Sequence, residues 1–173
     1  ALGGGVEREG DKLLIEAKNL VSGNIPEELC RKIRTSILCV APLLHRIGSV
    51  ELFPPGGDVI GRRRLDTHFY GLEKLGATID VGARAYQFDL KNGFTGQDLF
   101  FDEASVTATE HIMMAAVVAA GQTNIRNAAS EPHVQDLAEI LNKMGAKITG
   151  IGTNQLHIEG VSSLHGCQHA VVS

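Results

Sequence analysis

The stretch Leu72-Glu73-Lys74-Leu75-Gly76-Ala77-Thr78-Ile79 decides the fold, because it recurs later in the chain as Leu141-Asn142-Lys143-Met144-Gly145-Ala146-Lys147-Ile148. Each copy predicts the end of an amphipathic helix at a glycine, followed directly by a strand. The apolar faces of the two helices have the same spacing and consist of Leu65, Phe69, Leu72 and Leu75 in one and Val134, Ala138, Leu141 and Met144 in the other. Internal repetition of this kind predicts a chain built from repeated units.

Each copy continues as a predicted hairpin. The alternation of Tyr86, Phe88 and Leu90 predicts a strand with one buried face, and residues 156–158 predict its counterpart. A third copy opens the chain, with the motif at residues 2–6 followed by Leu13, Ile15 and Ala17. The chain is therefore expected to begin inside a repeat.

A second helix also recurs, first at residues 36–46 and again at residues 109–119. Both helices are apolar nearly all round, so we expect both at the centre of the molecule and covered by sheets. Pro42 is expected to kink the first of them. The repeat unit is then strand, buried helix, strand, amphipathic helix, strand, strand, and it predicts an α/β domain.

The composition limits the classes of function. With 173 residues, 43% of them hydrophobic, the chain can bury a core, and its net charge of −4 argues against general nucleic-acid binding. The longest apolar run, residues 112–120, is too short to span a membrane. Cys30, Cys39 and Cys167 form an odd, widely spaced set that predicts no disulfide framework. A reducing compartment, the cytoplasm, is expected.

One loop breaks the repeat. The two buried helices start at Ser36 and Thr109, and the amphipathic helices have equivalent residues at Leu72 and Leu141. The sequence separation of the first pair is larger than that of the second pair. The difference places an insertion between Gly48 and Leu65, in residues 54–64, whose counterpart at residues 127–132 is a plain turn. Its glycines and its arginines around Asp58 suit a loop that closes on an anion, with Asp58 placed to exchange a proton. The alternative is a solvated surface loop.

Two helix starts are further candidates for anion binding. Arg34 begins a buried helix, where a guanidinium needs either a bound anion or an ion pair with Glu27 or Glu28. Residues 105–107 precede the other buried helix, so their N–H groups could hold phosphate oxygens. Ordinary helix capping is the alternative for the second site.

The histidines form no strong metal pattern. The motif His165-x-Cys167-x-His169 could place three ligands together, but it lacks a supporting acid, and we favour no metal. His68, close to the arginine loop, could bond within the loop, face a ligand or simply pack. Residues 150–154 predict a hairpin turn rather than a nucleotide-binding loop.

Further motifs follow one another along the chain: R-x-S-I-L at 34–38, A-P-L-L at 41–44, P-G-G-D-V-I-G-R-R at 55–63, D-x-H at 66–68, G-L-E-K-L-G-A at 71–77, S-V-x-A-T at 105–109, N-A-A-S-E-P at 127–132, then G-x-G-T and I-E-G-V. In this order they resemble the UDP-N-acetylglucosamine 1-carboxyvinyltransferases of the enolpyruvyl transferase family. The resemblance covers nearly the whole chain.

The resemblance implies an inside-out α/β barrel domain of βαβαββ repeats, three to a domain, of which this chain is a truncated part. Within one domain over residues 1–173, residues 1–20 are then the tail of a first repeat, 21–91 the second repeat and 92–162 the third. Residues 163–173 would start the crossover to a second domain of the same protein.

The activity that the resemblance implies joins the enolpyruvyl group of phosphoenolpyruvate to the 3′-hydroxyl of UDP-N-acetylglucosamine, the first committed step of peptidoglycan precursor synthesis. No cofactor and no metal are expected, and neither is a nucleic-acid or membrane partner. Asp58 falls at the proton-donor position, where the family usually has a cysteine that the epoxide antibiotic fosfomycin alkylates. An aspartic acid can supply this proton if loop closure raises its pKa.

The other site residues are implied by the same resemblance. Arg34 matches a contact to the UDP-sugar, and Arg63 matches a loop arginine near the phosphates. The uridine-binding stretch of the family corresponds to Arg64, Leu65, Asp66 and Thr67. The start of its diphosphate-binding helix corresponds to Glu103, Ala104, Ser105 and Val106.

Three departures keep an alternative open. Glu103 stands where the family commonly has a lysine, Arg64 where it has a proline, and Thr107 where it has a glycine. A non-catalytic or altered-substrate paralogue is therefore the second hypothesis. A sibling acting on another acceptor, like the shikimate-pathway enzyme, is a third, and the G-D-V-I-G loop counts against it. Other catalytic groups of the family are absent from this chain, so we expect no turnover by the isolated piece.

Overall fold

The computed structural model describes residues 2–57 and 64–171. Its helices are α1 (Glu27–Lys32), the 3₁₀ helix η1 (Arg34–Cys39), α2 (Val40–Ile47), α3 (Asp66–Lys74), α4 (Val106–Ala116) and α5 (Pro132–Lys143). Its strands are β1 (Gly5–Glu9), β2 (Lys12–Glu16), β3 (Ser49–Leu52), β4 (Thr78–Val81), β5 (Tyr86–Asp89), β6 (Asp98–Phe100), β7 (Gln122–Arg126), β8 (Lys147–Thr149) and β9 (Gln155–Glu159).

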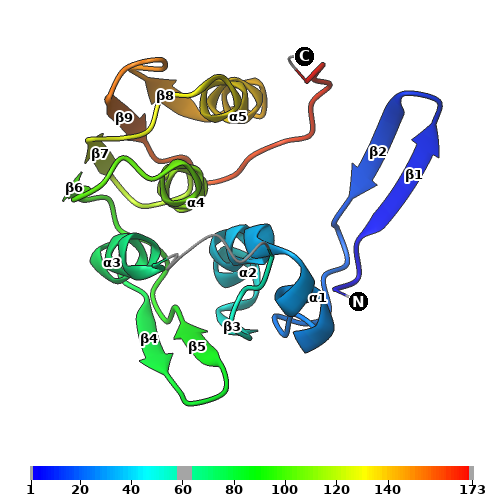
Figure 1. Cartoon of the computed structure of the whole chain (residues 1–173). Helices are drawn as coiled ribbons and strands as arrows, with labels where there is room; N and C mark the ends of the chain where they lie inside the picture. Colours follow the sequence, from blue (N-terminus) through cyan, green and yellow to red (C-terminus); the bar gives the residue numbers. More distant parts are fainter. Residues whose placement is uncertain (1, 58–63, 172–173) are drawn as a thin grey trace.

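Two sheets cover a layer of helices. One sheet has the antiparallel order β3-β5-β4, and the other has the order β6-β7-β9-β8, in which only β6 and β7 run parallel. Helices α2, α3 and α4 lie on the inner side of these sheets (Figure 1), and α4 contacts η1, α2, α3, α5, β7 and β9. The prediction of an α/β fold with central helices is confirmed.

Three equivalent hairpins confirm the repeat. Strand β4 pairs with β5 with Ile79 opposite Phe88, and β8 pairs with β9 with Ile148 opposite Ile158. Strands β1 and β2 form the third hairpin, which extends away from the two sheets (Figure 1). Both of its strands are exposed along their whole length. Its apolar alternation therefore has no burial partner among the described residues.

The two central helices are buried as expected, but their bounds differ from the prediction. The first begins as η1 and changes from 3₁₀ to α geometry at Val40, which places Pro42 in the first turn of α2. A proline is tolerated there because the N–H it lacks would have no helical partner. The second, α4, begins at Val106 instead of residue 109, because Ser105 caps it.

Close packing of α3 on α4 relies on a glycine. A Cβ atom on Gly71 would overlap the side chain of Ile112, which is completely buried. Beneath α3, the ring of Phe69 packs edge-on against Phe88 and Tyr86 of β5, with ring centroids 5.7 and 5.2 Å apart. Gly71 thus allows α3 to lie close to α4, and the aromatic contacts hold α3 against β5. Among the described residues, no helix has both the length and the apolar character needed to cross a bilayer.

Candidate functional site

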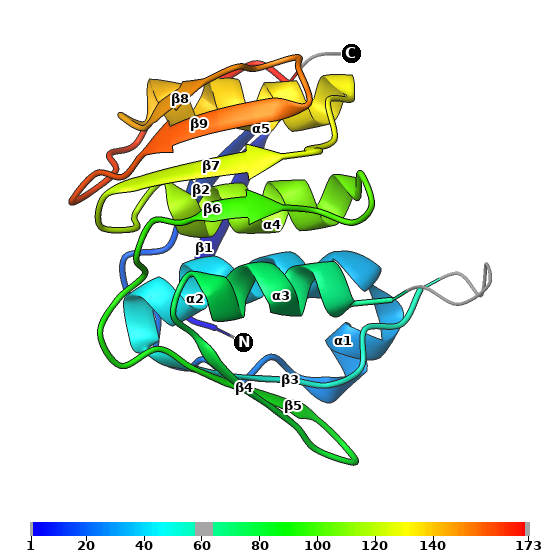
Figure 2. The same cartoon turned by 90° about the vertical axis from the view of Figure 1, so that its left-hand side faces the viewer.

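The starts of η1, α3 and α4 meet at one side of the molecule. Figure 2 shows the N-terminal ends of α3 and α4 on the same side. The guanidinium of Arg34, at the start of η1, donates a hydrogen bond from Nη2 to the carbonyl oxygen of Arg64 over 3.1 Å. Thr67 of α3 donates to the carboxylate of Asp102, just before α4, over 3.4 Å. Three separate segments that carry predicted site residues therefore form one surface.

The start of α3 presents one cation and one carboxylate. Arg64 forms an ion pair with Asp66, and both side chains are more than half exposed. An exposed pair of this kind contributes little stability. Leu65 and Thr67, which alternate along the chain with Arg64 and Asp66, are buried and hold the helix start in place. The guanidinium of Arg64 is thus exposed, and the backbone carbonyl of the same residue holds the guanidinium of Arg34, so this surface carries two cations.

The start of α4 combines capping with free N–H groups. Ser105 has an extended backbone, and its hydroxyl accepts a hydrogen bond from the N–H of Ala108 at 3.4 Å, so the capping alternative is confirmed. A helix nevertheless leaves its first N–H groups without a partner inside the helix. Glu103 and Ala104 precede the cap and are exposed. The carboxylate of Glu103 therefore lies close to a helix start that favours anions.

A buried pair of histidines connects α3 to α4, and sequence reasoning missed it. His68 and His111 lie with their Nδ1 atoms 3.1 Å apart. The Nε2 atom of His111 accepts the N–H of Ala41 at 3.1 Å, and Nε2 of His68 lies 3.3 Å from the hydroxyl oxygen of Thr107. Of the three possibilities for His68, the structure shows burial and bonding to another histidine. The available signal was His111 itself, a titratable residue in an apolar helix.

Burial keeps both imidazoles neutral. Desolvation, with the nearby Arg34 guanidinium, lowers the pKa of His68 to about 4, and burial lowers the pKa of His111 well below its ordinary value. The unfolded chain protonates these rings near the ordinary pKa of 6.5. The neutral pair therefore contributes its full stability above about pH 6.5, and that contribution is lost as the pH falls toward 4.

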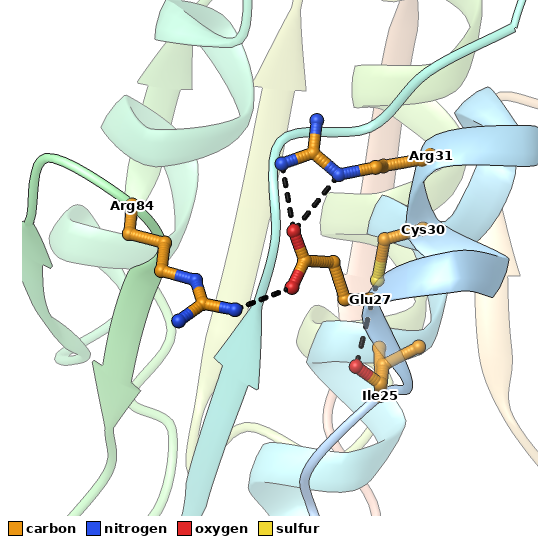
Figure 3. Close-up of polar contacts among 5 residues, drawn as sticks. All are labelled: Ile25, Glu27, Cys30, Arg31 and Arg84. Atoms are coloured by element: carbon orange, nitrogen blue, oxygen red, sulfur yellow. Dashed lines mark hydrogen bonds and ion pairs between the residues drawn. The ribbon is translucent and has the colours of Figure 1, made fainter.

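The Glu27 carboxylate joins α1 to the β4–β5 turn (Figure 3). It accepts hydrogen bonds from Nη2 of Arg84 at 2.8 Å and from Nε and Nη2 of Arg31 at 2.9 and 2.7 Å. These two arginines hold the pKa of Glu27 below its ordinary value, Arg84 contributing most. Glu27 was one of the two acids expected as a possible ion-pair partner of Arg34. In the structure its carboxylate is bonded to Arg31 and Arg84.

The segment that enters the arginine loop lies against the end of α1. The N–H of Gly56 donates to the carbonyl oxygen of Cys30 over 2.8 Å, and a Cβ atom at Gly56 would overlap the carbonyl oxygen of Arg31. Glycine is therefore required at this close approach. Asp58 and Arg63, which the sequence places in the same loop, lie outside the described residues, and their roles stay predictions.

The His165, Cys167 and His169 side chains are not brought together as ligands. His169 Nε2 bonds to the Asp136 carboxylate at 2.7 Å, the Cys167 thiol lies 3.9 Å from the Ile140 carbonyl oxygen, and His165 bonds to its neighbouring backbone. Within residues 2–57 and 64–171, no group of three or more His, Cys, Asp or Glu side chains is arranged to hold a metal ion. Residues 150–154 form the predicted hairpin turn between β8 and β9.

A cavity of about 590 Å³ lies elsewhere, between β2, Arg46 and the C-terminal segment. Its lining includes Leu14, Ile15, Met144 and Leu164 and none of the predicted site residues. It is therefore separate from the surface formed by the three helix starts.

Comparison with known proteins agrees with the motifs. The chain is 53% identical over 172 residues to the UDP-N-acetylglucosamine 1-carboxyvinyltransferase of Treponema denticola. The matched region covers 99% of this chain and 40% of the relative. The chain is 55% identical over 152 residues to the protein of the same name from Bradyrhizobium diazoefficiens, covering 88% of this chain and 35% of the relative. The chain thus spans about two fifths of the length of the curated relatives it matches.

Solved structures support the fold. The enolpyruvyl transferase NikO from Streptomyces tendae superposes with a TM-score of 0.77 at 19% identity, covering 95% of this chain and 39% of NikO. The EPSP synthase from Acinetobacter baumannii gives a TM-score of 0.69 at 17% identity, covering 95% and 38%. The model of one protein family matches residues 1–173 in full. The chain belongs to that family, EPSP synthase (3-phosphoshikimate 1-carboxyvinyltransferase).

Proposed function

We propose that this chain is part of an enzyme that transfers the enolpyruvyl group of phosphoenolpyruvate to the 3′-hydroxyl of UDP-N-acetylglucosamine. The observation that carries the proposal is the identity above 50% to curated UDP-N-acetylglucosamine 1-carboxyvinyltransferases over almost the whole chain. Such an enzyme would act in the cytoplasm, in the synthesis of peptidoglycan precursors for the cell wall, and so in cell shape and division. Its second domain would complete the active site.

The geometry of the helix starts supports a nucleotide-sugar site. The diphosphate of UDP-N-acetylglucosamine is an anion that needs cations and N–H donors. Arg34 and Arg64 supply two guanidinium groups, and that of Arg34 donates a hydrogen bond to the backbone carbonyl of Arg64. The start of α4 supplies backbone N–H groups. Residues 64–67 and 103–106 would hold the nucleotide between them.

The proton-donor loop would supply the chemistry. Addition of the hydroxyl to phosphoenolpyruvate requires a proton on the methylene carbon, and loss of phosphate then completes the transfer. Asp58 is the proposed donor and Arg63 the proposed partner of the phosphate. In the same proposal, residues 21–91 and 92–162 are complete repeats, residues 1–20 belong to a preceding repeat, and residues 163–173 lead to the second domain.

A second candidate function rests on Glu103. Its exposed carboxylate precedes the α4 start and would repel a diphosphate. A paralogue with an altered substrate or without catalysis would tolerate this charge.

Substrate titration separates these functions. We expect calorimetry of the full-length protein to show saturable binding of UDP-N-acetylglucosamine. Inorganic phosphate should be released from phosphoenolpyruvate when this acceptor is present, and not when shikimate 3-phosphate replaces it. Binding without phosphate release would favour the non-catalytic paralogue, and release with shikimate 3-phosphate would favour the sibling activity. Absence of binding would contradict the proposal.

Neighbouring arginines test the loop register. We expect Arg63→Ala in the full-length protein to lower kcat/KM for phosphoenolpyruvate by about 10- to 100-fold, because a charge-assisted hydrogen bond to phosphate is worth roughly 1.5 to 3 kcal/mol. The matched control is Arg62→Ala, which should change kcat/KM by less than about threefold. Initial-rate kinetics of phosphate release provide the measurement. Equal effects at the two positions would show that the register is wrong.

A further inference from the structure

A chain of hydrogen bonds runs from α2 through the core to the start of α4. Its members are the N–H of Ala41, His111, His68 and the hydroxyl of Thr107, with successive distances of 3.1, 3.1 and 3.3 Å. Both imidazoles are at most 2% exposed. The two rings lie between helices of different repeats, so the chain of bonds connects the middle of the fold to the proposed nucleotide site.

The backbone amide at one end sets the direction of every bond. An amide N–H can only donate, so Nε2 of His111 must accept and the proton of this neutral ring lies on Nδ1. That N–H points to Nδ1 of His68, which therefore accepts and carries its own proton on Nε2. The Nε2–H of His68 then donates to the hydroxyl oxygen of Thr107. One tautomer of each ring satisfies all three contacts.

The last bond determines what the Thr107 hydroxyl offers. A hydroxyl has one proton and two lone pairs, and here His68 occupies a lone pair. The hydroxyl proton is therefore available to a further acceptor. Thr107 lies in the first turn of α4, half-buried and directly after Ser105 and Val106. An acceptor at this helix start would meet the backbone N–H groups and the hydroxyl proton together.

We propose that His111 and His68 are positioning residues that orient the Thr107 hydroxyl as a hydrogen-bond donor to a phosphate oxygen of a nucleoside diphosphate bound at the α4 start. The inference rests on the proposed function, because that function supplies the diphosphate. Thr107 is then a specificity residue, since its hydroxyl adds a side-chain donor to the backbone N–H groups of this helix start.

Isothermal titration of the full-length protein with UDP tests the hydroxyl. Thr107→Val keeps the shape and removes the donor, and we expect it to weaken UDP binding about 10- to 100-fold, the range for a hydrogen bond to a charged group. Thr107→Ser keeps the donor and should bind within about threefold of the unmodified protein. Equal UDP affinity of the Val variant and the unmodified protein would overturn the proposal.

Variants of His68 test the orientation. The amide of His68→Gln can still donate to Thr107, whereas His68→Leu cannot. We expect the Leu variant to weaken UDP binding severalfold and the Gln variant to restore most of it. In the Thr107→Val background, His68→Leu should cause no further loss. A merely structural role would give additive effects in the double variant, and that result would overturn the relay.

The tautomers can be observed directly. Nitrogen-15 correlation spectra of the histidine-labelled full-length protein should place the proton of His111 on Nδ1 and that of His68 on Nε2, with the His68 and His111 variants assigning the signals. A His68 proton on Nδ1 would overturn the inference while the proposed function stands. If the unmodified protein bound neither UDP nor UDP-N-acetylglucosamine, the proposed function would be overturned. The hydrogen bond from Thr107 to a phosphate oxygen would then be overturned with it.

Discussion

Asp58→Asn is expected to lower kcat for enolpyruvyl transfer by the full-length protein about 10²- to 10⁴-fold, the usual contribution of a positioned general acid. The amide has nearly the same shape as the acid but cannot deliver a proton to the methylene carbon. Single-turnover measurement of phosphate release would isolate the chemical step. Turnover by the Asn variant close to that of the unmodified protein would show that Asp58 is not the proton donor.

A cysteine at the same position supplies the matched control. Asp58→Cys should retain turnover and should become sensitive to fosfomycin, because a thiolate opens epoxides readily while a carboxylate is a much poorer nucleophile toward them. The unmodified protein should resist this compound. Intact-mass spectrometry would detect the adduct, and covalent labelling of the unmodified protein at another residue would contradict the assignment.

Phe88→Ala should destabilise the chain by about 3–5 kcal/mol, the range for removing a large aromatic side chain from a core. Phe88 is completely buried at the centre of β5, opposite Val50 of β3 and Ile79 of β4. Its loss also removes the edge-on contact with Phe69 of α3. Urea unfolding followed by circular dichroism would measure the change in free energy.

Phe100 offers the control for this experiment. It lies on β6 and is 64% exposed, so Phe100→Ala should change the free energy of unfolding by no more than about 0.5 kcal/mol. If the two substitutions destabilised the chain equally, Phe88 would not be part of the core that the structure shows.

The repeat architecture could be predicted from the sequence, because it depends on local patterns. The glycines at 76 and 145 end helices in both copies with positive φ, which other residues adopt only at a cost. The alternation at Phe88 and Ile158 determines which strand face is buried. The burial of α4 followed from its lack of a polar face. The helix bounds shifted by a few residues because caps and prolines act over one turn, a scale that apolar spacing does not resolve.

The candidate site residues could be named one by one from the sequence, but which of them lie together could not. Apolar spacing says which face of a helix is buried and nothing about which other helix lies against it. Only the tertiary structure brings Arg34 to the carbonyl of Arg64, 30 residues away, and Glu27 to Arg84, 57 residues away. These bonds exist because the packing of the layers places the helix starts and turns side by side.

The pair of His68 and His111 shows most clearly what the sequence could predict and what only the tertiary structure decided. From the sequence, His68 had three possible roles and His111 had none, since a single imidazole in an apolar pattern does not reveal its partner. Close approach of α3 and α4 across Gly71 places the two rings in contact, 43 residues apart in the chain, and excludes water from both. Local sequence thus determined the elements of this protein, and long-range packing decided which polar groups meet, because a buried polar group must find its partner wherever the fold brings one within reach.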